Sequence, residues 1–455
     1  MANSDLTRTI SSAGNLTTWT FSAWVKFCEG STQNCGIFSQ GSSGDNVTSI
    51  FFNHSNGAHR LEWRQYQSGS YTARKTTNRS FNDRSGWYHI VCQWDTTNGT
   101  AGDRMKIWIN GERETSFESS VDPSSSLASV VNSTTGTMNV GKYWDNSNYM
   151  NGYMAHVAFV NGAVVAPTVF GETDSTSGIW KFKSPSGVTW GTNGFHLKFE
   201  NSGAMGTDSS GNSNTFTVNG NLKQALDTPS NTYCTMNPLD NYYPASTFTT
   251  GNNSIGTAGS KRSYNTGTLG VSSGKWYWEV KAVSSVTASN GCWIGIASTN
   301  ATNDGVSSQQ TLGYKQYDYG FSSSTGNINT NNSQSSYGSG YGDNDIVGVA
   351  MDLDNNKLYF HVNGTYENSG VPTSGSTGTG AVSIQAPSGT LNGVYTPGLG
   401  DWWTSGFNVA FNFGDGFFGT TAISSAGSNG NGSLFEYDVP SGYYALNTTN
   451  INTYG

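Results

Sequence analysis

The chain has 455 residues, a formal net charge of −8 and only 11% charged residues, against about 25% in an average protein. The negative net charge argues against nucleic-acid binding, which needs a basic surface. Lys and Arg also form no cluster beyond short pairs. The 13% aromatic content, with 14 Trp, excludes a disordered chain. The 58 Gly residues among many Ser, Thr and Asn predict an all-β protein with long polar loops.

The first third of the chain contains a series of segments in which apolar and polar residues alternate. Residues 18–27 place Trp19, Phe21, Ala23 and Val25 on one side, as expected for a half-buried strand. No segment in this part has a convincing helical period. Further strands are predicted at residues 50–52, 61–63, 86–95, 105–110, 138–141 and 153–160.

The order of these segments resembles a known family. The runs TFSAWVKF, GWYHIVCQWD, MKIWINGE and NVGKYWDNSNYMNG are similar, in this order, to laminin-G-like or concanavalin A-like jelly-roll sandwiches. The resemblance implies two packed antiparallel sheets over residues 1–170.

Residues 171–240 differ from the parts on either side, because turn-forming residues dominate and only residues 195–199 and 215–218 look like strands. The segment also carries Trp180 and Trp190, so we expect an ordered connector. Its pattern resembles the segment between two β-domains in many tailed-bacteriophage virion proteins.

The last part of the chain is organised around residues 343–364, which read as two strands joined by a tight turn at Asp354-Asn355-Asn356. Together with GKWYWEV, CWIGIAS, DYGF, FNFGDGFF and VPSGYYAL, this hairpin makes residues 241–455 resemble a SPRY domain. The resemblance implies a second antiparallel jelly-roll sandwich. Residues 420–433 depart from the SPRY pattern and are expected to form a surface loop.

Catalytic patterns are scarce in this sequence. A glycan depolymerase needs two carboxylates about 5–9 Å apart. However, Asp354 falls in a turn and Glu279 alternates with Trp278 on a predicted strand, so structural roles explain them. We therefore expect a protein that is not an enzyme. The carboxylates considered are Glu62, Asp95, Glu112, Glu279, Asp352 and Asp354.

Metal-binding and disulfide patterns are equally weak. The five cysteines are scattered and odd in number, which argues against a zinc site or a disulfide framework. They are expected to be buried thiols, with a Cys28–Cys35 bridge as the alternative in an oxidising medium. The six histidines are expected to be sheet residues rather than ligands.

Calcium is the one cofactor for which the sequence offers ligands. Laminin-G-like and related sandwiches often hold calcium with loop carboxylates and carbonyls. The resemblance therefore implies a calcium site built from such loop oxygens. One candidate set is Asp145 with Asn146 and Asn148, and the other begins at Asp208. Asx turns explain both sets without a metal.

Two polar loops carry an unusual density of aromatic residues. Large rings beside amide and carboxylate groups are typical of sugar or protein recognition. The alternative is that these rings fold back onto the core. The candidate ligand-binding residues are Tyr143, Trp144, Asp145, Asn146 and Tyr149 in the first sandwich, and Asp401, Trp402 and Trp403 in the second.

These patterns predict a non-enzymatic virion protein of a tailed phage, made in the host cytoplasm and exposed on the particle as a tail fibre, tail appendage or head decoration. This step from fold to role is analogy. The expected partners are other virion proteins, copies of itself, and host-surface glycan or protein. Membrane insertion is not expected, since no apolar run is long enough and residues 1–14 lack a secretory pattern. The alternatives are a tail-borne polysaccharide depolymerase and a purely architectural decoration.

Overall fold

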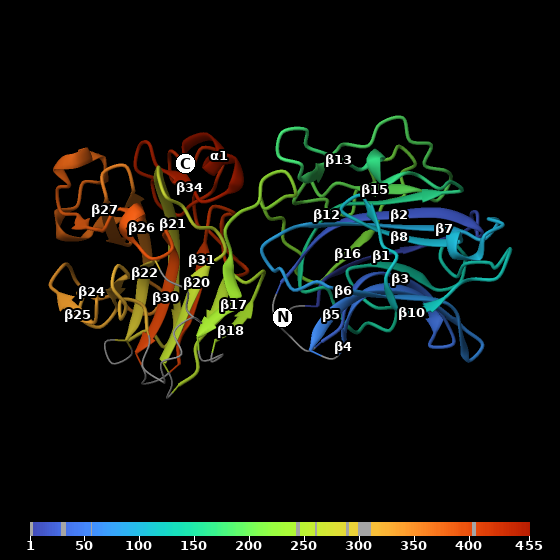
Figure 1. Ribbon diagram of the computed structural model, residues 1–455, viewed down its shortest axis with the longest axis horizontal. Helices are drawn as coiled ribbons and strands as arrows, with labels where there is room; N and C mark the ends of the chain where they lie inside the picture. The colour runs from blue at the N-terminus through green and yellow to red at the C-terminus, as the bar shows by residue number, and fades with distance from the viewer. Residues whose placement is uncertain are drawn as a thin grey trace. The chain divides into compact units, whose positions relative to one another are not determined.

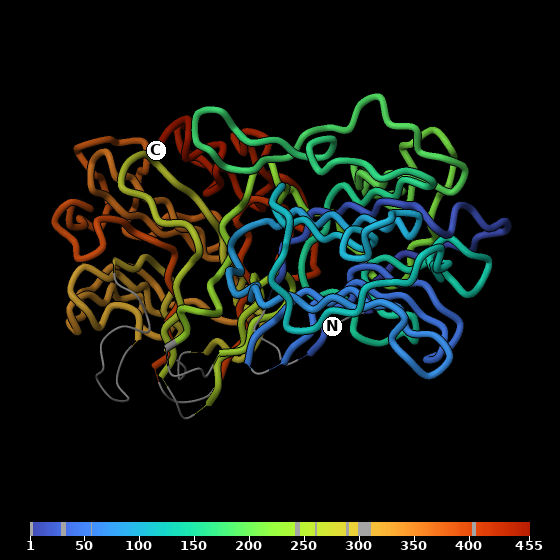
Figure 2. The backbone as a smooth tube through the Cα atoms, turned by 45° about the vertical axis from the view of Figure 1, so that its right-hand side comes forward, coloured from blue at the N-terminus to red at the C-terminus, as the bar shows by residue number. Residues whose placement is uncertain are grey.

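The computed structural model describes residues 3–28, 33–55, 57–242, 246–259, 262–287, 291–298, 311–402 and 406–455. Figure 1 shows the arrangement of strands, and Figure 2 traces the same backbone from another side. The chain forms two compact units, the first ending at Gln224 and the second beginning at Ala225. Strands dominate both units, and an α-helix, α1 (Thr448–Tyr454), ends the chain. No helix in the described ranges is both long enough and apolar enough to span a membrane.

The first unit is a sandwich of two antiparallel sheets. In the described residues, one sheet has the strand order β10 (Phe117–Val121), β6 (Ser70–Ser80), β5 (Ala58–Gln67), β4 (Asn46–Ser55), β3 (Cys35–Ser43), β11 (Thr137–Val140), β1 (Asp5–Thr9) and β16 (Thr217–Asn219). The other has the order β15 (Phe195–Leu197), β12 (Gly152–Asn161), β2 (Thr18–Phe27), β7 (Tyr88–Asp95), β8 (Met105–Ile109) and β9 (Glu112–Arg113).

The strand predicted at residues 18–27 is confirmed as β2, but it is buried on both faces rather than half-buried, since Trp24 on the outer face packs with Trp180 and Phe182. Trp19, Phe21, Ala23 and Val25 all lie in the core between the two sheets. Trp19 stacks on Trp94 with ring centroids 6.0 Å apart. Burying these rings removes a large apolar area from water, which is the main stabilising contribution to such a sandwich.

The expected connector, residues 171–240, is divided between the two units. Up to Gln224 it belongs to the first unit, where β15 pairs with β12 and β16 pairs with β1. The hairpin of β13 (Gly171–Thr173) and β14 (Trp180–Phe182) also lies here. Most of the connector belongs to the first unit because its apolar residues Phe195, Leu197 and Phe216 are buried in the core of that unit.

The second unit also has two packed sheets, whose strands pair antiparallel except for the parallel pair of β21 and β34. In the described residues, one has the order β17 (Met236–Tyr242), β20 (Arg262–Gly267), β30 (Thr396–Trp402), β22 (Cys292–Ala297), β23 (Tyr319–Ser322), β24 (Ile328–Thr330) and β25 (Ser333–Ser335). The other has the order β18 (Thr247–Thr249), β19 (Ser254–Gly256), β31 (Asn408–Asn412), β21 (Lys275–Ser284), β26 (Ile346–Asp352), β27 (Lys357–Val362) and β28 (Thr365–Tyr366), with β29 (Val382–Ser383) on β27 and β34 (Tyr444–Ala445) on β21.

The hairpin predicted in residues 343–364 is confirmed as β26 and β27. Asp352 pairs with Lys357, and the Asp352 carboxylate accepts a 2.9 Å hydrogen bond from the backbone of Asn355. Asn356 adopts a φ of 56°, a left-handed conformation that Asn tolerates better than most residues. Leu358 and Phe360 face the core between the sheets, while Tyr359 lies on the other face, as the alternation requires.

The outer face of the sheet that contains β21 is covered by the end of the chain. Phe435, Val439 and Tyr443 pack there against Tyr277 and Tyr359. The predicted surface loop at residues 420–433 is mostly exposed, but it ends in a buried Ser433. The cysteines Cys28, Cys35, Cys92, Cys234 and Cys292 are all buried.

Candidate ligand-binding site

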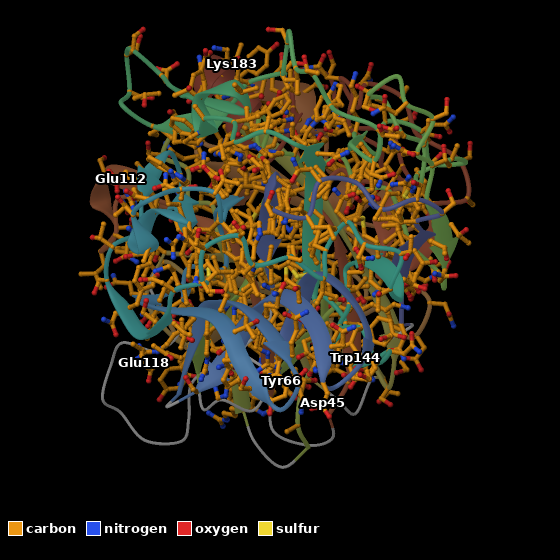
Figure 3. All side chains as sticks on the ribbon, turned by 90° about the vertical axis from the view of Figure 1, so that its right-hand side faces the viewer. Asp45, Tyr66, Glu112, Glu118, Trp144 and Lys183 are labelled. Atoms are coloured by element: carbon orange, nitrogen blue, oxygen red, sulfur yellow. The ribbon has the colours of Figure 1, made fainter. Side chains whose placement is uncertain are left out.

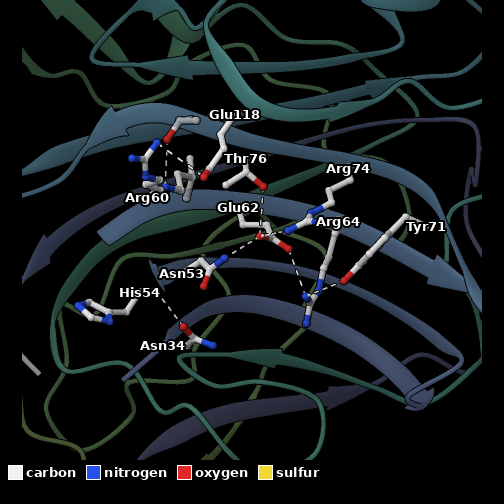
Figure 4. A network of polar contacts seen from close by, with 12 residues as sticks. Asn34, Asn53, His54, Arg60, Glu62, Arg64, Tyr71, Arg74, Thr76 and Glu118 are labelled. Carbon is white, nitrogen blue, oxygen red and sulfur yellow. Dashed lines mark hydrogen bonds and ion pairs between the residues drawn. The ribbon is translucent and has the colours of Figure 1, made fainter. Parts of the chain in front are cut away.

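The outer face of β5 and β6 carries a polar network that begins at Glu62. Along β5, Leu61 and Trp63 point into the core, so the alternating residues Glu62 and Arg64 point outward. Arg64 pairs directly with Arg74 on β6. Figure 4 shows these side chains converging on the Glu62 carboxylate.

Glu62 is fully buried, although its charge lies on the outer side of the sheet. Its carboxylate accepts hydrogen bonds from Arg64 Nη1 at 3.2 Å, Arg74 Nη2 at 3.0 Å, Asn53 Nδ2 at 2.9 Å and Thr76 Oγ1 at 3.1 Å. A buried carboxylate needs such partners, because an uncompensated charge in the interior is very costly. Glu62 therefore holds the two guanidinium groups in fixed positions.

Aromatic rings surround the Arg64 guanidinium. Its carbon lies 4.8 Å from the ring centre of Phe51, 5.5 Å from that of Tyr143 and 5.9 Å from that of Tyr71, within cation–π range. Arg64 also donates a hydrogen bond to the Tyr143 hydroxyl. Burial works against the charge, but the Tyr143 hydrogen bond and the Glu62 carboxylate outweigh it and raise the pKa of Arg64.

Partly exposed rings lie at the edge of this network. Tyr71 is 37% exposed, packs edge-on against Tyr66 at 4.9 Å, and lies 4.7 Å from the Arg74 guanidinium. Tyr66 itself is half-buried. We call Arg64, Tyr66, Tyr71, Arg74, Tyr143 and Trp144 the arginine–tyrosine patch.

Trp144 joins the patch through Tyr143 and through the turn between β3 and β4. Its ring lies 6.5 Å from that of Tyr143, and a Cβ atom added at Gly44 in the turn would come within 3.9 Å of the indole. Figure 3 shows Trp144, Asp45 and Tyr66 on one side of the first unit. Asp45 and Asp145 are both exposed.

The predicted aromatic loop at residues 143–149 is only partly exposed to solvent. Tyr143 is buried, so for this ring the fold-back alternative is right, whereas Trp144 and Tyr149 are half-buried. Asp145 accepts hydrogen bonds from the backbone and hydroxyl of Ser147, forming an Asx turn. Asn146 is exposed, and its side-chain oxygen accepts a 2.7 Å hydrogen bond from Lys142.

The second predicted loop needs a correction. Asp401 is fully buried inside β30, where it pairs with Ser263 and Cys292 and accepts a 2.6 Å hydrogen bond from Thr257. Its carboxylate is therefore not at a loop tip, because the strand continues one residue beyond it. Trp402 is half-buried and packs against Arg262 at 3.9 Å and Trp293 at 6.3 Å. Trp403 lies outside the described residues.

The candidate calcium ligands have protein partners. Both oxygens of Asp208 accept hydrogen bonds, from the backbone of His196, Ser210 and Asn214 and from the Ser210 hydroxyl, at 2.8–2.9 Å. The Asn148 side-chain amide donates to the Ser147 hydroxyl, and the backbone carbonyl of Asn148 accepts from the backbone N–H of Gly36. Within the described ranges, no three His, Cys, Asp or Glu residues form a group able to hold a metal ion. Calcium binding stays a prediction.

The remaining candidate carboxylates also have structural partners. Asp352 forms a 3.0 Å ion pair with Lys275, Asp354 accepts from the backbone of Gly274, and Asp95 accepts from Thr97. Glu112 lies on the surface, with its side chain 82% exposed and 4.0 Å from Arg79.

Glu279 differs from these carboxylates because it is buried and, within the described part of the chain, forms no ion pair. It accepts hydrogen bonds from the backbone of Glu436 and Tyr437, at 2.9 and 2.8 Å, and from the Tyr277 hydroxyl at 3.0 Å. Burial raises its pKa to about 7. Glu279 thus anchors the covering segment at the end of the chain.

Sequence reasoning missed the arginines of the patch. Arg64 and Arg74 are ten residues apart, and only the register of β5 and β6 brings them together. The alternation Leu-Glu-Trp-Arg at residues 61–64 was the available signal, because it places two opposite charges on one face of a strand.

Comparison with known protein families identifies a domain in each unit. Residues 4–170 match the concanavalin A-like lectin/glucanases superfamily, in its laminin-G-like form, and residues 275–383 match the SPRY domain. The chain therefore contains a concanavalin A-like domain and a SPRY domain, and two β-sandwiches are confirmed. A search of curated proteins found no match.

Solved structures give weak overall similarities. The SPRY domain of human HERC1 is 13% identical, with a TM-score of 0.29, covering 39% of this chain and 96% of that one. Another human SPRY domain is 13% identical, with a TM-score of 0.24 and coverage of 35% and 90%. A heptameric SAP-like pentraxin from Limulus polyphemus is 16% identical, with a TM-score of 0.26 and coverage of 36% and 73%.

Proposed function

We propose that this chain is a non-enzymatic phage virion protein, a tail fibre, tail appendage or head decoration, that attaches to host-surface glycan through the arginine–tyrosine patch. The observation that carries the proposal is the set of partly exposed rings and guanidinium groups fixed around the buried Glu62. Aromatic rings and Arg are the residues that most often dominate binding surfaces.

The rigidity of the patch supports a binding role. Glu62 fixes Arg64 and Arg74, and Tyr71 packs on both Tyr66 and Arg74. A surface that is ordered before binding loses little conformational entropy when a ligand arrives. Single sugar contacts are weak, so we expect millimolar to micromolar affinity per site, about −4 to −8 kcal/mol.

A paired tryptophan experiment tests the proposal. The full chain, Trp144→Ala and Trp402→Ala are compared for binding to bacterial cells and to an array of bacterial surface polysaccharides. We expect Trp144→Ala to weaken binding, and Trp402→Ala, a matched change in the other unit, to leave it unchanged. Equal binding by all three proteins would refute the role of the patch. Release of reducing ends from a bound polysaccharide would favour the depolymerase alternative.

The virion part of the proposal rests on the resemblance of residues 171–240 to phage virion proteins, and it implies copies of the chain and other virion proteins as partners. Repeated weak sites gain avidity without new contacts. Light scattering of the purified chain and electron microscopy of the particle test this part. A monomer that touches no copy of itself on the particle would contradict it.

A further inference from the structure

The end of the arginine–tyrosine patch that holds Arg64 and Arg74 contains more positive than negative charge. Two guanidinium groups, Arg64 and Arg74, share the single Glu62 carboxylate. One positive charge is therefore left over at this place, in a chain whose formal net charge is −8. Neighbouring Arg60 does not alter this balance, because it lies 3.6 Å from Glu118.

The two guanidinium groups are also within reach of a ligand. The side chains of Arg64 and Arg74 are 24% and 26% exposed, while the carboxylate that binds them is fully buried. For Arg74, Nη2 contacts Glu62. Arg74 Nε is buried, and the terminal nitrogens of Arg64 already donate to Glu62, Tyr71 and Tyr143. The planar guanidinium fork carries five N–H donors, so the remaining terminal donors, chiefly those of Arg74, are the ones that can meet a ligand carboxylate.

We infer that the ligand of this patch is an acidic saccharide, a polymer or oligomer containing uronic acid residues, whose carboxylate contacts Arg74 and Arg64. The inference rests on the proposed function, since it names the ligand class for that same surface. An uncompensated cation on an acidic protein attracts a negatively charged ligand to one place, because the negative charges on the rest of the surface repel that ligand.

The patch also gives the ligand a direction. The arginines and Tyr71 form one end, and Trp144, near the exposed Asp45 and Asp145, forms the other. A carboxylate is attracted to the first end and repelled from the second, where hydroxyl groups donate to the aspartates instead. The acidic sugar therefore sits over Tyr71, and the neighbouring sugar extends toward Trp144.

The test uses polygalacturonate, alginate and hyaluronate, each beside its own carboxyl-reduced form, which keeps the backbone and loses the charge. Binding to the full chain is measured by calorimetry or biolayer interferometry at low and moderate salt. We expect at least one acidic polymer to bind at least about tenfold more tightly than its reduced form, with affinity falling as salt rises.

Three variants separate the contributions. Arg74→Gln should abolish the preference for the acidic form, and Arg74→Lys should reduce it, since Lys lacks the planar fork. Tyr71→Ala should weaken the acidic and reduced forms alike. Arg79→Gln is the matched control, because Arg79 lies on the same strand with its side chain 44% exposed and contacts Glu114 instead. Circular dichroism and thermal unfolding verify that each variant is folded.

The outcomes distinguish the two proposals. Equal binding of an acidic polymer and its reduced form, or an unchanged preference in Arg74→Gln, would overturn the acidic-ligand inference and leave the glycan-binding function standing. Binding to dextran sulfate as tight as to every uronate polymer would also overturn it, because the site would then select charge alone. Failure to bind any saccharide, with Tyr71→Ala and Trp144→Ala also without effect on cells, would overturn both.

Discussion

The indole Nε1 of Trp180 donates a 3.1 Å hydrogen bond to Nδ1 of His89, and the two rings lie nearly parallel with centroids 5.9 Å apart. His89 also stacks on Trp24, with ring centroids 4.7 Å apart. Because Nδ1 accepts this bond, the ring proton lies on Nε2, which faces the Ser22 hydroxyl at 2.9 Å. This stack fastens the β13–β14 hairpin to the outer face of the sheet that contains β2.

We expect Trp180→Ala to release that hairpin. Trp180 is half-buried, so losing its packing and its hydrogen bond should lower the free energy of unfolding by about 2 kcal/mol. Hydrogen exchange of residues 171–182 should accelerate strongly. Gly171→Ala should have a similar effect, since its Cβ would lie 2.5 Å from the indole. Unchanged exchange in both variants would show that the stack does not hold the hairpin.

Acid should destabilise the folded chain through its buried histidines. Burial lowers the pKa of His89 and His361 to about 3, and that of His156 and His196 to about 4. Unfolded histidine has a pKa of about 6.5, so below that pH the unfolded chain binds more protons. The free energy of unfolding then falls as the pH falls from about 6.5 toward 4, by up to about 1.4 kcal/mol per pH unit for each histidine.

Urea unfolding at pH 7 and pH 5 measures this dependence. His89→Gln should have a shallower pH dependence than the parent, because one of the four groups no longer titrates. His54→Gln is the control, since His54 is only half-buried. An identical slope for the parent and His89→Gln would contradict the assignment.

Glu279 should have the opposite pH dependence. Its pKa is raised to about 7 by burial, so the folded chain binds the proton more tightly than the unfolded chain does. The stability it contributes is present below the unfolded pKa of about 4.3 and is lost as the pH rises through 7. Glu279→Gln should therefore gain stability relative to the parent between pH 5 and pH 8, on the order of 3 kcal/mol.

Urea unfolding of the parent and Glu279→Gln across that pH range provides the measurement. Glu112→Gln is the matched control, because its side chain is 82% exposed. Hydrogen exchange at Glu436 and Tyr437, which donate to Glu279, reports whether the anchor survives. A constant difference between parent and variant from pH 5 to pH 8 would disprove this prediction.

Trp402 should contribute to stability rather than to recognition. Its ring packs against Arg262 and Trp293. A partly buried cation–π pair stabilises the folded state by about 1–2 kcal/mol, and the packing of the ring adds to this. Trp402→Ala should lower the midpoint of thermal unfolding, whereas Trp144→Ala should change it less. Weaker saccharide binding by a stably folded Trp402→Ala protein would point instead to a second binding surface.

The strands of both sandwiches could be predicted because their pattern is local. Alternation at residues 18–27 and the Asp-Asn-Asn turn at residues 354–356 each specify a strand or hairpin without reference to distant residues. The roles of β15 and β16 could not be predicted in this way. Each has only three residues, and β16 pairs with β1 more than two hundred residues earlier in the chain.

The candidate site was predictable to a similar extent. Aromatic density singled out Tyr143 and Trp144, but the guanidinium groups beside them depend on strand register, which short-range patterns do not specify. Asp401 was misplaced because the run Asp-Trp-Trp-Thr-Ser-Gly looks like a turn, although β30 extends through Trp402.

The pairing of β16 with β1 determines where the chain can be cut. A fragment ending at residue 170, where the concanavalin A-like match ends, would lose β15 and β16 and leave β12 and β1 as bare edges. It would also uncover the core positions filled by Phe195 and Phe216. Unpaired edges beside exposed apolar surface promote aggregation. A fragment ending at Gln224 keeps both edges paired. We expect this fragment, unlike the one ending at residue 170, to be expressed in soluble form.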